Sequence, residues 1–196
     1  MADLEKLKRN LEERGFSVSC FDTAEEAAAY LDAALDGKTI GIGGSVTIRD
    51  MGLAERLSTH ARVYWHWNED ALEQAASAQV YLTSVNGLAE TGELINIDGT
   101  GNRVASTIFG HEEVYFLVGS NKIAPDYDAA LWRARNIASP KNAQRLGKKT
   151  PCAVKGDRCY DCQSPERICR ALAVLWEKPT GIGRAEVVLI DEPLGY

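Results

Sequence analysis

The sequence predicts an α/β fold in which a mostly parallel sheet carries helices on both faces. Short apolar runs alternate with amphipathic segments along most of the chain, which is typical of strand–helix–strand units. Three of the apolar runs end in loops rich in glycine and small polar residues, at 39–47, 80–92 and 114–123. Ligands of open α/β sheets bind beyond the carboxyl ends of the strands, so these loops predict one shared pocket.

The N-terminal elements follow from residue spacing and capping. Leucines recur at helical spacing over 3–14, which predicts an amphipathic helix that ends at Gly15. Thr23 and Glu26 have the spacing of a capping box, in which the hydroxyl bonds the Glu26 amide and the carboxylate reaches back to the Thr23 amide. An alanine-rich helix is therefore expected to begin here and to end at Gly37.

The rest of the chain continues the alternation of strands and helices. Runs of β-branched and apolar residues predict strands, and apolar residues at helical spacing predict helices. The expected strands are 16–21, 39–43, 61–65, 79–83, 93–98, 113–118 and 185–190. The expected helices are 47–57, 69–78, 126–138 and 141–146, with a break at Pro140, a helical turn around Leu88, and a hairpin turn or bulged corner at 98–102.

Length and composition indicate one ordinary globular domain. A chain of 196 residues can bury one well-packed core, so we expect a single domain over 1–196 with 148–170 as an irregular excursion rich in cysteine. The net charge of -6 argues against a nucleic-acid surface, which needs clustered lysine and arginine. No apolar run approaches the ~20 residues of a membrane helix, and the acidic N-terminus is not a signal peptide. A cytoplasmic location is therefore expected.

Four cysteines in the excursion have the spacing C-x6-C-x2-C-x6-C: Cys152, Cys159, Cys162 and Cys169. Four thiolates around a central C-x2-C can hold a zinc ion or an iron–sulfur cluster, and the spacing does not decide between them. Disulfides are disfavoured because no secretion signal is present. Four reduced, half-buried thiols without a metal are the third interpretation.

Two charged residues at strand ends are candidates for chemistry. Glu90 follows a predicted buried strand, where a carboxylate can act as a nucleophile, a base or a ligand anchor, or can be a solvated turn residue. Lys122 at the third strand end can bind the phosphate or carboxylate of a small anionic metabolite. We expect Ser45, Glu90 and Lys122 around one cavity. The predicted ligand-binding residues of the three loops are Gly43, Gly44, Ser45, Thr83, Ser84, Gly87, Thr91, Asn121 and Lys122.

Other polar and aromatic residues are interpreted as structural. His66 follows the 61–65 strand without a cysteine or carboxylate at metal-like spacing. Arg133 and Arg135 fit the solvated face of the 126–138 helix, although one of them could reach an acidic ligand. Trp67 is expected to pack at a strand end or at a subunit contact, which is compatible with a homo-oligomer.

Several of these motifs together resemble one family. They are the runs 81–98, 102–106 and 118–123, His111, the glycine–serine loop 43–47, the cysteine block 149–169 and the final residues 194–196. This set resembles the LUD (lactate-utilization) domain, and its cysteine block resembles a cysteine-bearing subgroup of that family. The resemblance covers nearly the whole chain.

The resemblance implies a fold shared with CoA transferases, ribose-5-phosphate isomerases and glucosamine-6-phosphate deaminases. Some LUD proteins belong to an iron–sulfur system of lactate oxidation, so the resemblance implies an accessory or ligand-binding component of organic-acid metabolism, with redox subunits as partners. The chain lacks the long ferredoxin-like extension of larger members. The alternative is a free-standing enzyme of the CoA-transferase or sugar-phosphate-isomerase type that uses Glu90.

Overall fold

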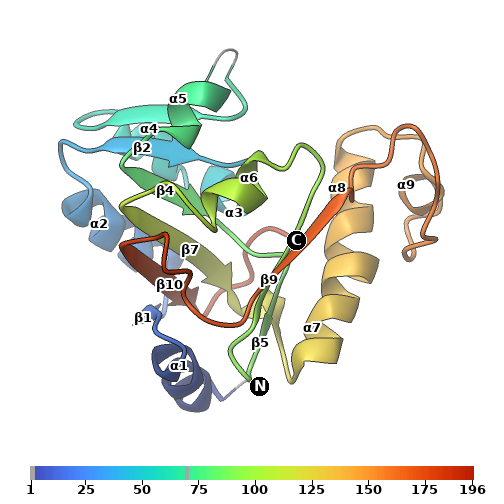
Figure 1. Ribbon diagram of the computed structural model, residues 1–196, viewed down its shortest axis with the longest axis horizontal. Helices are drawn as coiled ribbons and strands as arrows, with labels where there is room; N and C mark the ends of the chain where they lie inside the picture. The colour runs from blue at the N-terminus through green and yellow to red at the C-terminus, as the bar shows by residue number, and fades with distance from the viewer. Residues whose placement is uncertain (1–2, 69–70) are drawn as a thin grey trace.

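A parallel sheet forms the centre of the protein, as the alternation of strands and helices predicts (Figure 1). The computed structural model describes residues 3–68 and 71–196. Within them the central sheet has six strands in the order β1–β10–β7–β4–β2–β3, and every neighbouring pair is parallel. The strands are β1 (Ser17–Phe21), β2 (Thr39–Ile42), β3 (Arg62–Trp65), β4 (Val80–Thr83), β7 (Glu113–Gly119) and β10 (Arg184–Ile190).

A second, smaller sheet packs beside the first. Its order is β8–β5–β6–β9, and it is mixed, because β5 pairs parallel with β8 while β6 pairs antiparallel with β5 and β9. The strands are β5 (Gly87–Ala89), β6 (Leu94–Asp98), β8 (Ile123–Ala124) and β9 (Ala171–Leu175). The helical turn expected around Leu88 is wrong, because Leu88 lies in β5 and pairs with Leu94 and Ile123. Strand β9 was not expected from the sequence.

Helices cover both faces of the central sheet, as predicted (Figure 1). The α-helices of the described residues are α1 (Leu4–Glu13), α2 (Ala24–Ala34), α3 (Val46–Asp50), α4 (Leu53–Leu57), α5 (Leu72–Ala76), α6 (Asn102–Ser106), α7 (Tyr127–Arg133), α8 (Ser139–Arg145) and α9 (Pro151–Lys155), of which α7 packs on the second sheet. The helix expected over 47–57 is two helices, because Gly52 takes a left-handed conformation at φ 61° and separates α3 from α4. Of the helix expected over 69–78, residues 69–70 lie outside the described part, and α5 forms its C-terminal half.

Two local expectations near the second sheet differ from the structure. The segment 98–102 leads from β6 into α6 through Gly101, which has φ 93°, and not into a hairpin. The break at Pro140 is absent, because a π-helical segment, Ala134–Ala138, joins α7 to α8. Pro140 lies in the first turn of α8, where a missing N–H costs little, and the Ser139 hydroxyl donates to the Ala134 carbonyl at 2.9 Å.

The hydrophobic core has two main parts, one on each face of the central sheet. Alternate residues of β7 point to opposite faces, since side chains alternate along a strand. Tyr115 and Leu117 pack with residues of α2, α3 and α4 on one face. Val114 and Phe116 pack with α1 and the second sheet on the other. A smaller cluster lies between the second sheet and α7, and includes Ala130.

The segment 148–170 contains α9 and is otherwise without regular structure. It lies against the α7–α8 side of the molecule (Figure 1). Its C-terminal end is tied to β6, because the Arg170 amide donates to the Asp98 carbonyl at 2.9 Å. Across residues 3–68 and 71–196, every helix is too short or too polar to span a bilayer.

The capping box of α2 is confirmed and gives a test of the fold. The Thr23 hydroxyl accepts from the Glu26 amide at 3.2 Å, and the Glu26 carboxylate accepts from the Thr23 amide at 3.2 Å. We expect Thr23→Ala to lower the free energy of unfolding by about 1 kcal/mol in urea titrations, because the Glu26 amide loses its acceptor at the helix N-terminus. Thr59→Ala, at an exposed turn, is the control and should cost less than about 0.5 kcal/mol. Equal losses of unfolding free energy in the two variants would contradict a capping role for Thr23.

Candidate functional site

Three strand ends of the central sheet meet at one edge, because β2, β4 and β7 are parallel. After β2 the chain turns through two glycines into α3, where the Ser45 hydroxyl accepts from the Ile48 amide at 3.3 Å. The turn needs small residues, since a Cβ on Gly43 would lie 2.8 Å from the Tyr81 hydroxyl. The polar loops of the sequence are therefore packed side by side.

Lys122 joins these three strand ends. It follows β7, its side chain is only 3% exposed, and its Nζ donates to Thr47 Oγ1 and Ser84 Oγ at 2.7 Å each. Thr47 lies in α3 after β2, and Ser84 follows β4. The Ser84 hydroxyl donates its own hydrogen to the Leu117 carbonyl at 2.5 Å, so it accepts from Lys122. Both partners of this buried amine are uncharged.

Two arginines add positive charge around Lys122. Arg133, from α7, is 7% exposed and donates to the carbonyls of Asn121 at 2.8 Å and Asn86 at 2.6 Å. It is not on a solvated face, and that expectation is wrong because its guanidinium turns inward to these two carbonyls. Burial lowers the pKa of Arg133 to about 10. Burial, followed by the charges of Arg133 and Arg103, lowers the pKa of Lys122 to about 7.

Arg103 holds the strand ends of both sheets together. Its guanidinium donates to the side-chain oxygens of Asn96 and Asn86 at 3.1 Å each and to the Ile97 carbonyl at 2.5 Å. Burial lowers the pKa of Arg103, although Asp98 acts in the opposite direction. Burial also disfavours the Asp98 carboxylate, but Arg103 and backbone N–H groups outweigh it, so the pKa of Asp98 lies below its usual value.

Lys122, Arg103 and Asp98 line a cleft made of two adjoining cavities, of about 250 Å³ and about 50 Å³, whereas Arg133 lines neither of them. Lys122 lines the smaller cavity, and His66 and Asp98 line the larger one. Both cavities share the same five residues, which are Gly44, Asn86, Arg103, Asn142 and Arg145. The cleft therefore has room for a metabolite of a few heavy atoms and presents cations and amides to it.

The structure brings several of the predicted ligand-binding residues together. Gly44, Ser45, Ser84 and Lys122 line the cleft. The other predicted residues near it are Gly43, against Tyr81 and Arg103; Asn121, which donates to the Gly195 carbonyl; Thr83, fully buried in β4; and Gly87, packed against the Ala130 carbonyl. These residues lie together at the strand ends, and their role in ligand binding stays a prediction.

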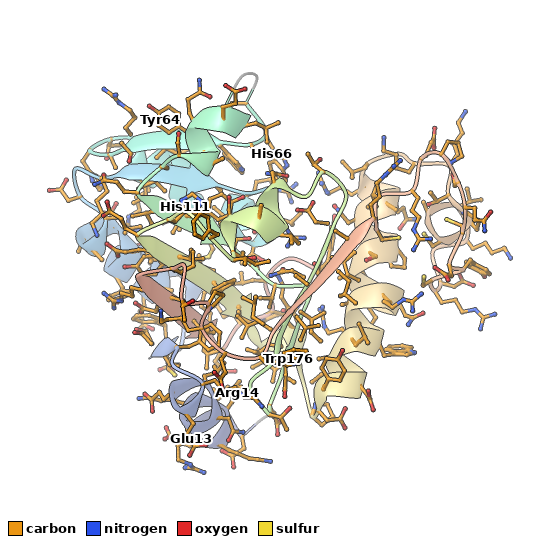
Figure 2. All side chains as sticks on the ribbon, viewed as in Figure 1. Glu13, Arg14, Tyr64, His66, His111 and Trp176 are labelled. Carbon is orange, nitrogen blue, oxygen red and sulfur yellow. The ribbon has the colours of Figure 1, made fainter. Side chains whose placement is uncertain are left out.

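Glu90 and Thr91 lie elsewhere. Strand β5 carries the chain from Asn86 at the cleft to the far end of the second sheet, where the Asn10 amide donates to the Glu90 carbonyl at 2.5 Å. Figure 2 shows this end by Arg14 and Trp176, with His66 at the opposite end of the molecule. Glu90 lines none of the described cavities, so it does not share one with Ser45 and Lys122. Its catalytic role stays a prediction.

Sequence reasoning missed several residues of the cleft. His66 lines it and accepts from the Asn102 amide at 3.2 Å, so its interpretation as purely structural is incomplete. Arg103 and Arg145 come from helices that do not follow the central strands, and the strand-end rule could not find them. For these two arginines the sequence offers one indication of a place in the cleft, which is that Arg103 follows the glycine-rich segment after β6.

The four cysteines converge on one small cavity of about 10 Å³. It is lined by Cys152, Cys159, Cys162 and Cys169 together with Arg135 and Arg167. Arg167 Nη1 and Nε donate to the carbonyls of Cys162 and Cys169 at 2.8 Å each. Within residues 3–68 and 71–196, however, no three His, Cys, Asp or Glu side chains lie close enough together to hold one metal ion. The four thiols therefore line one cavity, but they are not arranged as the ligands of a metal.

Comparison with known proteins identifies the family. The sequence model of the LUD domain matches residues 4–190. The chain belongs to the LUD domain family. The crystal structure of a DUF162 family protein from Deinococcus radiodurans is similar to this LUD domain, with a TM-score of 0.59 and 14% identity over 95% of each chain, which shows a shared fold. No curated protein matches the sequence.

The buried amine of Lys122 gives a pH test. Its pKa is about 7 in the folded LUD domain and near its ordinary value of about 10 in the unfolded chain, so the unfolded chain binds more protons between these pH values. The wild-type protein should therefore gain unfolding free energy relative to Lys122→Met as the pH rises from 7 to 9. Lys141→Met, at an exposed position of α8, should show no such trend. If the difference in unfolding free energy between the wild type and Lys122→Met did not change with pH, Lys122 would not be a buried neutral amine.

Proposed function

We propose that the cleft binds a small organic anion and that this LUD protein is an accessory or ligand-binding component of organic-acid metabolism in the cytoplasm. The observation that carries the proposal is the pair of arginines in the cleft. Among the described residues, Arg103 and Arg145, which line both cavities, form no salt bridge within 4.0 Å. A guanidinium that faces a cleft without such a partner can bind the carboxylate of an anionic ligand.

The overall charge makes this pair of arginines more informative. The chain has a net charge of -6, so a local excess of cations is not the average property of its surface. Arg145 sits at the cleft with its guanidinium 5.1 Å from the Trp67 ring centroid and bonded to the Asn142 side chain at 2.9 Å. A guanidinium in this position can pair with a carboxylate, and the Asn86 amide beside it can bond an adjacent hydroxyl or oxo group.

The volume of the cleft favours a short ligand. Its larger cavity, about 250 Å³, is below the usual range for drug-sized ligands, and its lining includes the polar side chains of Asn86, Asn102 and Arg145. A hydroxy or oxo acid of a few carbons, which is the class that the name of the LUD family indicates, fits these properties. Lactate is the representative we propose to test.

We also propose that the four cysteines hold a metal ion or an iron–sulfur cluster, with redox subunits as partners. The donor set fits, because four thiols face one cavity and Arg135 and Arg167 lie beside them to balance thiolate charge. Such a group would order the 148–170 segment, and a cluster would in addition carry electrons. The enzyme alternative with Glu90 has no support from the cleft, which Glu90 does not line.

Binding of lactate tests the cleft. Isothermal titration of the wild-type protein should show saturable binding of lactate and none of lactamide, its uncharged analogue. Arg145→Gln should weaken binding about tenfold, the value of one charge-assisted hydrogen bond. Arg62→Gln, on the exposed side of β3, is the matched control and should bind as the wild type does. Equal affinity for lactate and lactamide, or no binding of lactate, pyruvate or phosphate, would exclude an anion site.

Metal analysis of protein purified without oxygen tests the thiols. We expect stoichiometric zinc, or iron with acid-labile sulfide and a brown colour that bleaches on reduction. Cys162→Ser should lose the metal and increase proteolysis within 148–170 while the sheet remains folded by circular dichroism. Cys20→Ser, at an exposed thiol of β1, should keep the metal. Metal-free wild-type protein after anaerobic purification would reject this part of the proposal.

A further inference from the structure

We propose that Lys122 is a nucleophile that forms an imine with the carbonyl group of an anionic oxo compound bound in the cleft. The inference rests on the proposed anion site and names its substrate class and reacting atom. The ligand would carry a ketone or aldehyde next to a carboxylate or phosphate, with its anionic group held by the cleft arginines.

The hydrogen bonds of Lys122 suit a neutral amine. An ammonium has three N–H donors, whereas a neutral amine has two and one lone pair. Nζ makes two hydrogen bonds, to Thr47 Oγ1 and Ser84 Oγ, and none of the described residues accepts a third. In the neutral form both N–H groups are therefore satisfied and the lone pair is unengaged. In the charged form one buried N–H has no acceptor, which costs free energy.

The surroundings of Lys122 favour the same form. Burial of the side chain and the charges of Arg133 and Arg103 all oppose a further positive charge, and among the described residues Asp50 acts against them. The resulting pKa of about 7 keeps a large fraction of the amine neutral at neutral pH. Desolvation and neighbouring cations are the general means by which enzymes activate a lysine for imine chemistry.

The cleft gives a carbonyl compound a path to Nζ. Lys122 lines the smaller cavity together with Arg103 and Arg145, and the two arginines continue into the larger cavity. An anion held by Arg103 or Arg145 thus lies in the space that Lys122 faces. The adjacent hydroxyls of Ser84 and Thr47 can orient the amine and exchange protons with the oxygen of the ligand.

The reaction balances without an oxidant or a reductant. The Nζ lone pair forms a bond to the carbonyl carbon, and the electron pair of the C=O double bond moves to the oxygen, which is protonated. The oxygen has then gained one of the two N–H protons, and the hydroxyl group of this carbinolamine leaves with the second N–H proton as one water molecule. A C=N bond remains, and its protonated form withdraws electrons from the neighbouring carbon atoms.

Reductive trapping tests the imine. The full-length protein is incubated with pyruvate and sodium cyanoborohydride, and the site of the reduced adduct is mapped by peptide mass spectrometry. We expect one saturable adduct, on Lys122, whose rate of formation rises as the pH passes through about 7. Lys122→Arg keeps a cation but should give no adduct, whereas Lys141→Arg should label as the wild type does. Dihydroxyacetone phosphate replaces pyruvate in a second arm, to show whether the anionic group is a phosphate, and acetone in a third.

The outcomes separate the imine from the anion site. An adduct on Lys122 from pyruvate or dihydroxyacetone phosphate, suppressed by excess lactate, supports the proposal. Adducts spread over surface lysines, or equal labelling by acetone, overturn it, because neither needs the cleft. If lactate and pyruvate bind in the titration while Lys122 stays unlabelled, the imine fails and the anion site stands. If no anion binds, the proposed function itself fails. Because labelling is mapped on the wild-type protein, the result does not depend on the folding of a variant.

Discussion

The hydrogen bonds from Lys122 to Thr47 and Ser84 are the interaction on which the site depends. They connect the segments after β2, β4 and β7, whose parallel alignment brings them to one edge of the sheet. An amine that is 3% exposed cannot be satisfied by water, so its two partners fix the positions of the three loops relative to one another. Gly43 and Gly44 have to be small because Tyr81 and Trp67 occupy the space that a Cβ would need.

The packing of these loops at one edge of the sheet also explains why positive charges gather around Lys122. Arg103 and Arg133 hold the second sheet and α7 against this edge through carbonyl and amide oxygens, which satisfy their donors without neutralising their charge. Three cations are thereby gathered in a protein that is acidic as a whole. Lysine is the one of the three whose pKa can fall far enough for the group to lose its proton near neutral pH. Deprotonation of Lys122 therefore reduces the repulsion among the three like charges. Packing requirements of the fold thus gather the cations on which the proposed anion site rests and place the amine beside them.

The sequence was informative where one local rule decides the outcome. Periodicity and capping located α1, α2 and the parallel strands, and the strand-end rule found Ser45, Ser84 and Lys122. It failed at Glu90 because β5 runs in the second sheet, and three residues of extended chain suffice to carry Glu90 away from the cleft. Arg103 and Arg145 reach the cleft only through tertiary packing of α6 and α8, which no spacing along the chain records.

The cysteine segment and the cleft are not independent. Ser139 and Ile168 line both the large cavity of the cleft and the cavity of the four thiols, so one wall separates the two. That wall is held against β6, because Arg170 bonds the Asp98 carbonyl and a Cβ on Gly99 would lie 2.7 Å from the Ile168 carbonyl. Asp98 in turn caps the segment that carries Arg103. Any group that fixed the four thiols would therefore also fix Ile168, and through β6 the position of Arg103 in the cleft.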